Sequence, residues 1–73
     1  MRKTYELENL ECANCAAKME RDISLYPEVK KCTIACMTSR MTLVLDDNAD
    51  LGDVLDRAQK VMRSYEKDCT IVR

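Results

Sequence analysis

The sequence predicts an α+β domain in which four strands form one antiparallel sheet and two helices cover one face of that sheet. Three observations lead to this prediction. Apolar and polar residues alternate in four short runs, apolar residues recur at helical spacing in two longer runs, and the runs follow the order strand, helix, strand, strand, helix, strand. This order is that of the ferredoxin-like βαββαβ sandwich.

The first strand and the first helix lie on either side of a pair of cysteines. In residues 3–9, apolar residues alternate with glutamates, which is typical of a strand with one buried face. The apolar spacing that follows predicts a helix from about Cys15 to Leu25. Pro27 prevents this helix from continuing, because proline lacks a backbone N–H and clashes with the preceding turn.

The second half of the chain predicts a hairpin, a helix and a last strand. Residues 29–35 and 41–45 alternate on either side of a polar turn at 38–40, which predicts a β-hairpin. Asp50 is a good N-cap residue for the second helix. The apolar stripe of this helix consists of Leu51, Val54, Leu55, Ala58, Val61, Met62 and Tyr65. Residues 69–73 predict a short last strand.

The composition predicts one small domain, residues 1–73, without a strongly charged partner. The net charge is −1, so the chain lacks the basic stripe that nucleic acid binding requires. No apolar run approaches the roughly 20 residues that span a bilayer, and no signal peptide is recognisable. The five cysteines, an odd number, fit a reducing compartment. We therefore expect a cytosolic domain with no nucleic acid partner and no membrane insertion of its own, either free-standing or part of a larger membrane protein.

Cys12 and Cys15 form a CxxC pair between the predicted strand and the predicted helix. A first cysteine in the loop and a second in the first helical turn can converge on one ion, and the helix N-terminus stabilises their thiolate forms. Three roles are open: a metal site, a redox disulfide and ordinary packing. A thioredoxin-like redox site is disfavoured, because that fold needs a longer chain and a proline facing the disulfide, whereas the only proline here is Pro27.

Glu11 directly precedes the pair and can supply a carboxylate oxygen to the same ion. Two thiolates suffice for Cu(I), whereas Zn(II) prefers four ligands, and Cd(II) and Pb(II) also take more than two. With Cu(I), two thiolates and a carboxylate would leave an unfavourable excess of negative charge. Glu11 therefore favours a divalent ion, at a site that keeps a coordination position open for passing the ion to another protein.

The residues around the cysteine pair resemble the sequence pattern of a known family. The element order and residues 10–20, LECANCAAKME, resemble the heavy-metal-associated domain, a family of copper chaperones and of N-terminal metal-binding domains of P1B-type ATPases. Asn9, Leu10 and Glu11 stand where the usual family pattern has Gly, Met and Thr, and we expect Leu10 to be a buried anchor beneath the metal loop. An acidic residue before the first cysteine is the variant associated with zinc-, cadmium- and lead-exporting ATPases. Residues 65–68, YEKD, are also similar to the divalent-metal members.

The resemblance implies a module without catalytic activity that binds one Cd(II), Zn(II) or Pb(II) ion through Cys12, Cys15 and Glu11. It would regulate or supply a heavy-metal efflux P-type ATPase, whose catalytic and transmembrane parts would be its partners. A free-standing copper(I) chaperone of the same fold is the alternative, followed by a dithiol redox module, and Cu(I) can bind in vitro in any case. We expect a monomer, with a metal-bridged dimer as the alternative.

The other cysteines and acidic residues near the chain end are interpreted as structural. Cys32 and Cys36 share the apolar face of their strand, and Cys69 alternates with an isoleucine, so packing is the expected role of all three. Glu66 and Asp68 can lie at the same end of the molecule as the CxxC pair. Surface charge is nevertheless the default role of such carboxylates.

Overall fold

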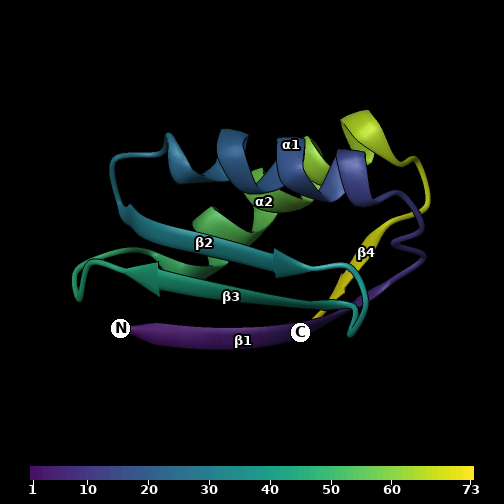
Figure 1. Cartoon of the computed structure of the whole chain (residues 1–73). Helices are drawn as coiled ribbons and strands as arrows, with labels where there is room; N and C mark the ends of the chain where they lie inside the picture. Colours follow the sequence, from purple (N-terminus) through teal and green to yellow (C-terminus); the bar gives the residue numbers. More distant parts are fainter.

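The computed structural model describes residues 1–73 and confirms the predicted order of elements (Figure 1). These elements are β1 (Arg2–Glu8), α1 (Ala13–Ser24), β2 (Val29–Ala35), β3 (Arg40–Leu45), α2 (Leu51–Tyr65) and β4 (Thr70–Val72). The strands pair antiparallel in the order β2-β3-β1-β4, and both helices lie on the same face of the sheet (Figure 1). The fold is therefore the predicted ferredoxin-like βαββαβ sandwich.

A single hydrophobic core fills the space between the sheet and the helices. All 17 buried residues are hydrophobic, so the core contains no polar residue that would need a hydrogen-bonding partner. Met19 and Met62 are fully enclosed in it, and Cys32 and Cys69 are buried in the same cluster. The predicted packing role of these two cysteines is confirmed. Met37, by contrast, is fully exposed in the turn between β2 and β3.

Helix α1 begins two residues earlier than the apolar spacing predicts. Cys12 is its N-cap, with an extended backbone and a sulfur that accepts the backbone N–H of Cys15. Cysteine is not among the common capping residues, so the sequence pattern alone does not indicate a start at Ala13. The helix ends at Ser24, with Leu25 as its C-cap, close to the predicted end.

Helix α2 and the strands deviate from their predicted bounds by small amounts. Asp50 is the N-cap of α2, as predicted, and its carboxylate accepts the backbone N–H of Asp53 at 3.2 Å. Strand β3 begins at Arg40, one residue before the predicted start, because this residue still pairs with both neighbouring strands. Strand β4 is shorter than predicted, since only three of its residues pair with β1.

Side chains from the helices cover backbone groups at both edges of the sheet. At the β2 edge, Glu20 Oε2 accepts the backbone N–H of Ile34 at 2.8 Å. At the β4 edge, Gln59 Nε2 donates to the carbonyl of Cys69 at 2.7 Å, and Gln59 Oε1 accepts the N–H of Ile71 at 2.8 Å. The Gln59 amide thus replaces a neighbouring strand. Such covering limits edge-to-edge pairing between two chains.

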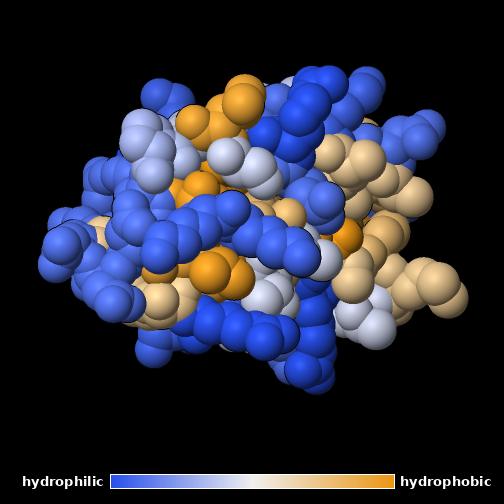
Figure 2. All heavy atoms as spheres, turned by 60° about the vertical axis from the view of Figure 1, so that its left-hand side comes forward, coloured by the Kyte–Doolittle hydropathy of each residue, from blue (hydrophilic) through white to orange (hydrophobic).

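Polar contacts hold the end of the molecule where α2 begins. The Arg57 guanidinium donates to the Glu28 carboxylate, pairs with Asp53 at 3.0 Å and lies 4.7 Å from the ring centroid of Tyr26. Hydrophilic atoms cover much of the surface in this view, with apolar atoms exposed between them and gathered on the right (Figure 2). Neither helix combines the length and the apolar character needed to cross a membrane.

Loops that are distant in the sequence meet at the opposite end of the sheet. Because β1 and β4 run antiparallel, the loop that follows β1 lies beside the loop that precedes β4. Asn9 Nδ2 donates to the carbonyl of Asp68 at 3.1 Å, which joins the two loops. The N–H of Leu7 donates to the carbonyl of Ser39 in the β2–β3 turn at 2.7 Å. The fold thereby places the residues after β1 next to those after α2.

Candidate metal centre

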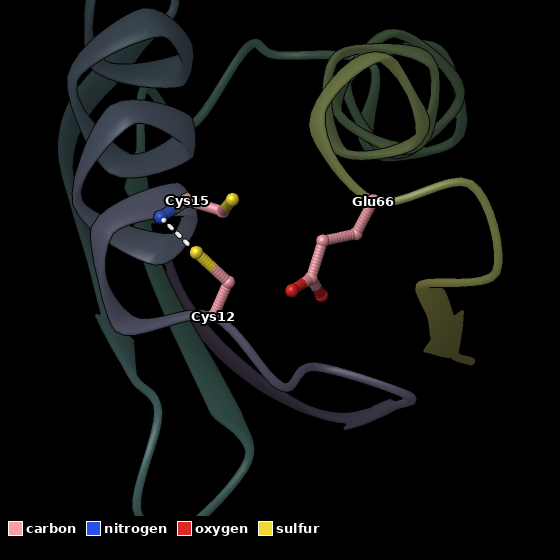
Figure 3. Close-up of side chains that lie close together, drawn as sticks. All are labelled: Cys12, Cys15 and Glu66. Atoms are coloured by element: carbon pink, nitrogen blue, oxygen red, sulfur yellow. Dashed lines mark hydrogen bonds between the residues drawn. The ribbon is translucent and has the colours of Figure 1, made fainter.

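The CxxC pair lies at the N-terminus of α1, as predicted. Cys12 is the N-cap and Cys15 belongs to the first turn, where its backbone N–H donates to Cys12 Sγ at 3.1 Å (Figure 3). Both residues are half-buried, and neither forms a disulfide. The pair is therefore available as free thiols, close to the positive end of the helix dipole.

The segment before the pair bends sharply, and its residues show how. Asn9 adopts φ = 61°, a left-handed conformation that asparagine tolerates better than most residues and glycine adopts freely. This explains why asparagine can replace the glycine of the family pattern that the sequence resembles. Leu10 is only 7% exposed and packs in the core beneath the loop, as expected. Together these two residues turn the chain from β1 towards the start of α1.

Glu66 brings a carboxylate to the two thiols. The Sγ atoms of Cys12 and Cys15 and a carboxylate oxygen of Glu66 all lie within 4.8 Å of one another, and the Glu66 side chain extends from the end of α2 towards the two cysteines (Figure 3). Two bonds of about 2.3 Å to one ion span at most about 4.6 Å, so small side-chain movements are enough for a single ion to contact all three donors.

Several contacts hold Glu66 in this place. It is the C-cap of α2, and its backbone N–H donates to the carbonyl of Met62 at 2.9 Å. Its carbonyl accepts the N–H of Cys69 at 3.1 Å. Its carboxylate accepts the backbone N–H of Glu11, which lies 3.2 Å from each oxygen. The α2–β4 loop and the CxxC loop are therefore connected through the carboxylate itself.

The sequence favours a surface charge at Glu66, whereas the structure places this carboxylate beside the two thiols. Periodicity within the sequence cannot reveal this proximity, because Glu66 and the CxxC pair belong to different halves of the chain. The available signal is topological: in a βαββαβ sandwich with β1 beside β4, the residue directly after the second helix is close to the loop after the first strand. Asp68, the other acidic residue before β4, is exposed and lies outside the three-donor group.

Glu11 lies next to the three-donor group without being part of it. Its side chain is exposed, and its carboxylate is not among the donor atoms that the structure brings together. A depression of about 240 Å³ adjoins this position and is lined by Asn9, Glu11, Glu66, Lys67 and Asp68. The Glu11 carboxylate is thus near the site, and its role as a metal ligand stays a prediction.

The two thiols differ in acidity. Hydrogen bonding from the side chain and backbone N–H of Cys15 lowers the pKa of Cys12 below its ordinary value. The same side-chain interaction raises the pKa of Cys15, and desolvation adds to this rise. The negative charge of Glu66 opposes ionisation of both thiols, while Lys18 favours ionisation of Cys15. Cys12 is therefore the thiol that ionises first.

The remaining cysteines lie outside this group. Burial raises the pKa of Cys32 to about 12 and also raises the pKa of Cys69, so both stay protonated in the core. Cys36 is half-buried in the β2–β3 turn and has no cluster of donor side chains around it. The structure thus distinguishes one pair with a neighbouring carboxylate from three isolated thiols.

Comparison with known proteins agrees with the geometry. The model of the family described as "Heavy-metal-associated domain" matches residues 4–67, which is most of the chain. A cadmium, zinc and cobalt-transporting ATPase of Helicobacter pylori is 42% identical over 43 residues. The match covers 59% of this chain and only 6% of the ATPase, so the similarity concerns a small part of that transporter.

Solved structures share the fold. The CopZ metallochaperone gives a TM-score of 0.74 at 11% identity, with 99% of this chain and 100% of the other covered. The CsoZ metallochaperone also gives 0.74, at 16% identity, with 100% and 97% covered. A yeast copper transporter domain gives 0.70 at 18% identity, with 99% and 94% covered. Identities this low show the fold alone, whereas the family match extends over the sequence itself: the chain belongs to the heavy-metal-associated domain family, whose members are metal-binding modules.

Proposed function

We propose that this domain binds one divalent ion, Cd(II), Zn(II) or Pb(II), through Cys12, Cys15 and Glu66, with Glu11 as an additional oxygen donor. The observation that carries the proposal is the convergence of two thiols and a carboxylate within 4.8 Å at the start of α1. Two sulfur donors suit soft and borderline ions, and an open position leaves room for ligand exchange.

The charge of the donor set supports a divalent ion. Two thiolates and one carboxylate carry three negative charges, of which a divalent ion leaves one uncompensated and Cu(I) leaves two. If the Glu11 carboxylate also turns inward, the donors number four, which is the coordination that Zn(II) prefers. A monovalent ion would then carry a still larger excess of negative charge in a half-buried place, which is unfavourable.

The domain would act as a regulatory or delivery module of a heavy-metal efflux P-type ATPase and would have no catalytic activity itself. The similarity to the cadmium, zinc and cobalt-transporting ATPase supports this role, as does the Glu11 variant of the family pattern. The metal ion is the cargo in this proposal. The catalytic and transmembrane parts of the transporter are the partners, and the domain works on the cytoplasmic side as a monomer.

An anaerobic titration of the reduced protein with Cd(II), followed by thiolate-to-metal absorption, tests the donor set. The chain lacks tryptophan, which leaves the ultraviolet window relatively clear. We expect one equivalent to bind, and we expect Cys12→Ser/Cys15→Ser to abolish binding. Glu66→Gln should weaken it about tenfold or more, which corresponds to a loss of about 1.4 kcal/mol.

Two matched variants serve as controls. Asp68→Asn removes an exposed carboxylate from the same loop, and Cys36→Ser removes a thiol outside the donor group. Both should leave the Cd(II) affinity and the stoichiometry unchanged. Undiminished binding by the double cysteine variant would move the metal to other residues and overturn the proposal.

A copper(I) chaperone is the second candidate, because the solved structures of the same fold include a yeast copper transporter domain and a copper binding domain of a P-type ATPase. Two thiolates are enough for Cu(I), so this reading assigns no role to the carboxylates. Competition titrations with a Cu(I) chelator and with a Zn(II) chelator separate the two candidates. If Glu66→Gln leaves Zn(II) and Cd(II) binding intact, the proposed divalent site is wrong, and the result favours the copper(I) chaperone.

A further inference from the structure

One side-chain hydrogen bond connects the two helices. The phenol of Tyr65, the last residue of α2, donates to Asp22 Oδ2 in α1. The other oxygen of Asp22 accepts the Nε–H of Arg21 at 3.3 Å, so the carboxylate is held from both sides. No other hydrogen bond or ion pair between side chains joins α1 to α2.

Both ends of this bond are connected to the donor group. Asp22 lies seven residues after Cys15, which places the two residues on the same face of α1 about 10 Å apart along the helix axis. Tyr65 directly precedes Glu66, the residue that brings the carboxylate to the thiols. The bond therefore runs from the helix that begins at the thiols to the residue next to the third donor.

The apolar contacts between the helices permit small relative movements of the helices, which this hydrogen bond restricts. The buried faces of α1 and α2 pack through Met19, Ile23 and Met62, among others, and hydrophobic contact has little directional preference. A hydrogen bond, in contrast, requires a defined distance and angle between donor and acceptor. The Tyr65–Asp22 bond thus limits sliding and rotation of the C-terminal turn of α2 against α1.

We propose that Tyr65 and Asp22 are positioning residues, which hold the Glu66 carboxylate opposite Cys12 and Cys15. This inference rests on the proposed function, in which Glu66 is a metal ligand. Groups that orient a ligand without touching the metal commonly contribute about 10- to 100-fold to metal affinity. The pKa of Asp22 is lowered by the hydrogen bond from Tyr65, so its carboxylate is ionised and remains an acceptor at neutral pH.

A double-mutant cycle separates positioning from a purely structural role. Tyr65→Phe removes the donor hydroxyl, and Asp22→Ala removes the acceptor. With Glu66 present, each change should raise the Kd for Cd(II) about tenfold. In a Glu66→Gln chain, the same changes should raise the Kd less than about twofold, because the carboxylate that they position is already absent.

The control is Tyr26→Phe. Tyr26 lies at the other end of the molecule, beside Arg57, and its phenol hydroxyl makes no side-chain hydrogen bond. The substitution should leave the Kd unchanged. The ¹¹³Cd chemical shift gives a second readout, since Tyr65→Phe should move it in the direction of the Glu66→Gln spectrum while Tyr26→Phe leaves it in place. This shift depends on the atoms bound to the metal and not on the stability of the domain.

Each outcome has one meaning. Equal effects of Tyr65→Phe with and without Glu66 overturn the inference, because the bond then stabilises the fold without orienting the ligand. An unchanged Kd with Glu66 present also overturns it. If Glu66→Gln alone does not weaken Cd(II) binding, the proposed donor set fails first, and this result is distinct from a failure of the positioning role.

Discussion

The backbone N–H of Cys15 donates to the sulfur of Cys12 at 3.1 Å, so the first thiol of the pair caps the helix that contains the second. This relationship contributes to the different acidities of the two thiols. The side-chain interaction with Cys15, followed by the hydrogen bond from its backbone N–H, lowers the pKa of Cys12, and the same side-chain interaction followed by desolvation raises the pKa of Cys15. A pair of identical side chains thereby becomes one readily ionised thiol and one that keeps its proton to higher pH.

The asymmetry predicts the order of alkylation in the reduced, metal-free protein. Near neutral pH, iodoacetamide should modify Cys12 faster than Cys15, because the thiolate is the reactive form. Cys32, whose pKa is raised to about 12, should react only when the chain unfolds. Mass spectrometry with fragmentation of the peptide that contains both CxxC thiols measures the order. Faster modification of Cys15 would contradict the capping interpretation, and bound Cd(II) should protect both residues.

Elements and core could be predicted from the sequence because each depends on a local pattern. Alternation and helical spacing identify which side chains of a strand or helix meet the core, and Met19 and Cys32 are buried accordingly. The start of α1 could not be predicted, since it depends on a cysteine acting as N-cap. Glu66 could not be identified as a donor for a different reason. Its proximity to the CxxC pair arises from the pairing of β1 with β4 and from a loop contact made by Asn9, neither of which has a local signature.

Gln59 provides a test of how the short strand β4 is held. Gln59→Ala removes two hydrogen bonds to backbone groups at the start of β4: one to the carbonyl of Cys69, directly before the strand, and one from the N–H of Ile71 within it. We expect it to lower the free energy of unfolding by about 1–3 kcal/mol, because these backbone groups lose their partners. Urea denaturation measures the change, and hydrogen exchange of the Ile71 amide should accelerate. Lys60→Ala, at the neighbouring exposed position, is the control and should change stability little.

The contact between Glu28 and Arg57 predicts how stability depends on pH in acid. The hydrogen bond from Arg57 lowers the pKa of Glu28 below its ordinary value of 4.5, so between the two values the unfolded chain binds more protons than the folded chain. The stabilisation is therefore fully present above pH 4.5 and is lost as the pH falls through the folded-state pKa. Glu28→Gln should flatten this part of the curve of urea midpoint against pH.

Glu8→Gln is the control for this pH dependence, because Glu8 is exposed and takes part in no ion pair. Its urea midpoint should fall with decreasing pH as steeply as that of the unmodified protein. An equally steep fall in Glu28→Gln would mean that other carboxylates cause the loss of stability in acid. Asp22 is then the next residue to substitute, since its pKa is also lowered, through the hydrogen bond from Tyr65.

Glu11 is the predicted ligand that lies outside the three-donor group, and the structure allows its side chain to be tested by itself. The backbone N–H of Glu11 donates to the Glu66 carboxylate. Glu11→Gln leaves this backbone contact in place and removes only the negative charge of the side chain. If Glu11 coordinates a divalent ion, the variant should weaken Cd(II) and Zn(II) binding about tenfold, or about 1.4 kcal/mol, and leave Cu(I) binding nearly unchanged.

The comparison between ions distinguishes coordination by Glu11 from general electrostatic attraction. A carboxylate that acts only through its charge would affect every cation at the site, and salt would screen its effect. Parallel losses for Cd(II), Zn(II) and Cu(I) that disappear at high ionic strength would therefore remove Glu11 as the element that selects divalent ions. A loss confined to the divalent ions and retained in high salt requires direct contact with the metal, because only such a contact depends on how many oxygen donors the ion accepts.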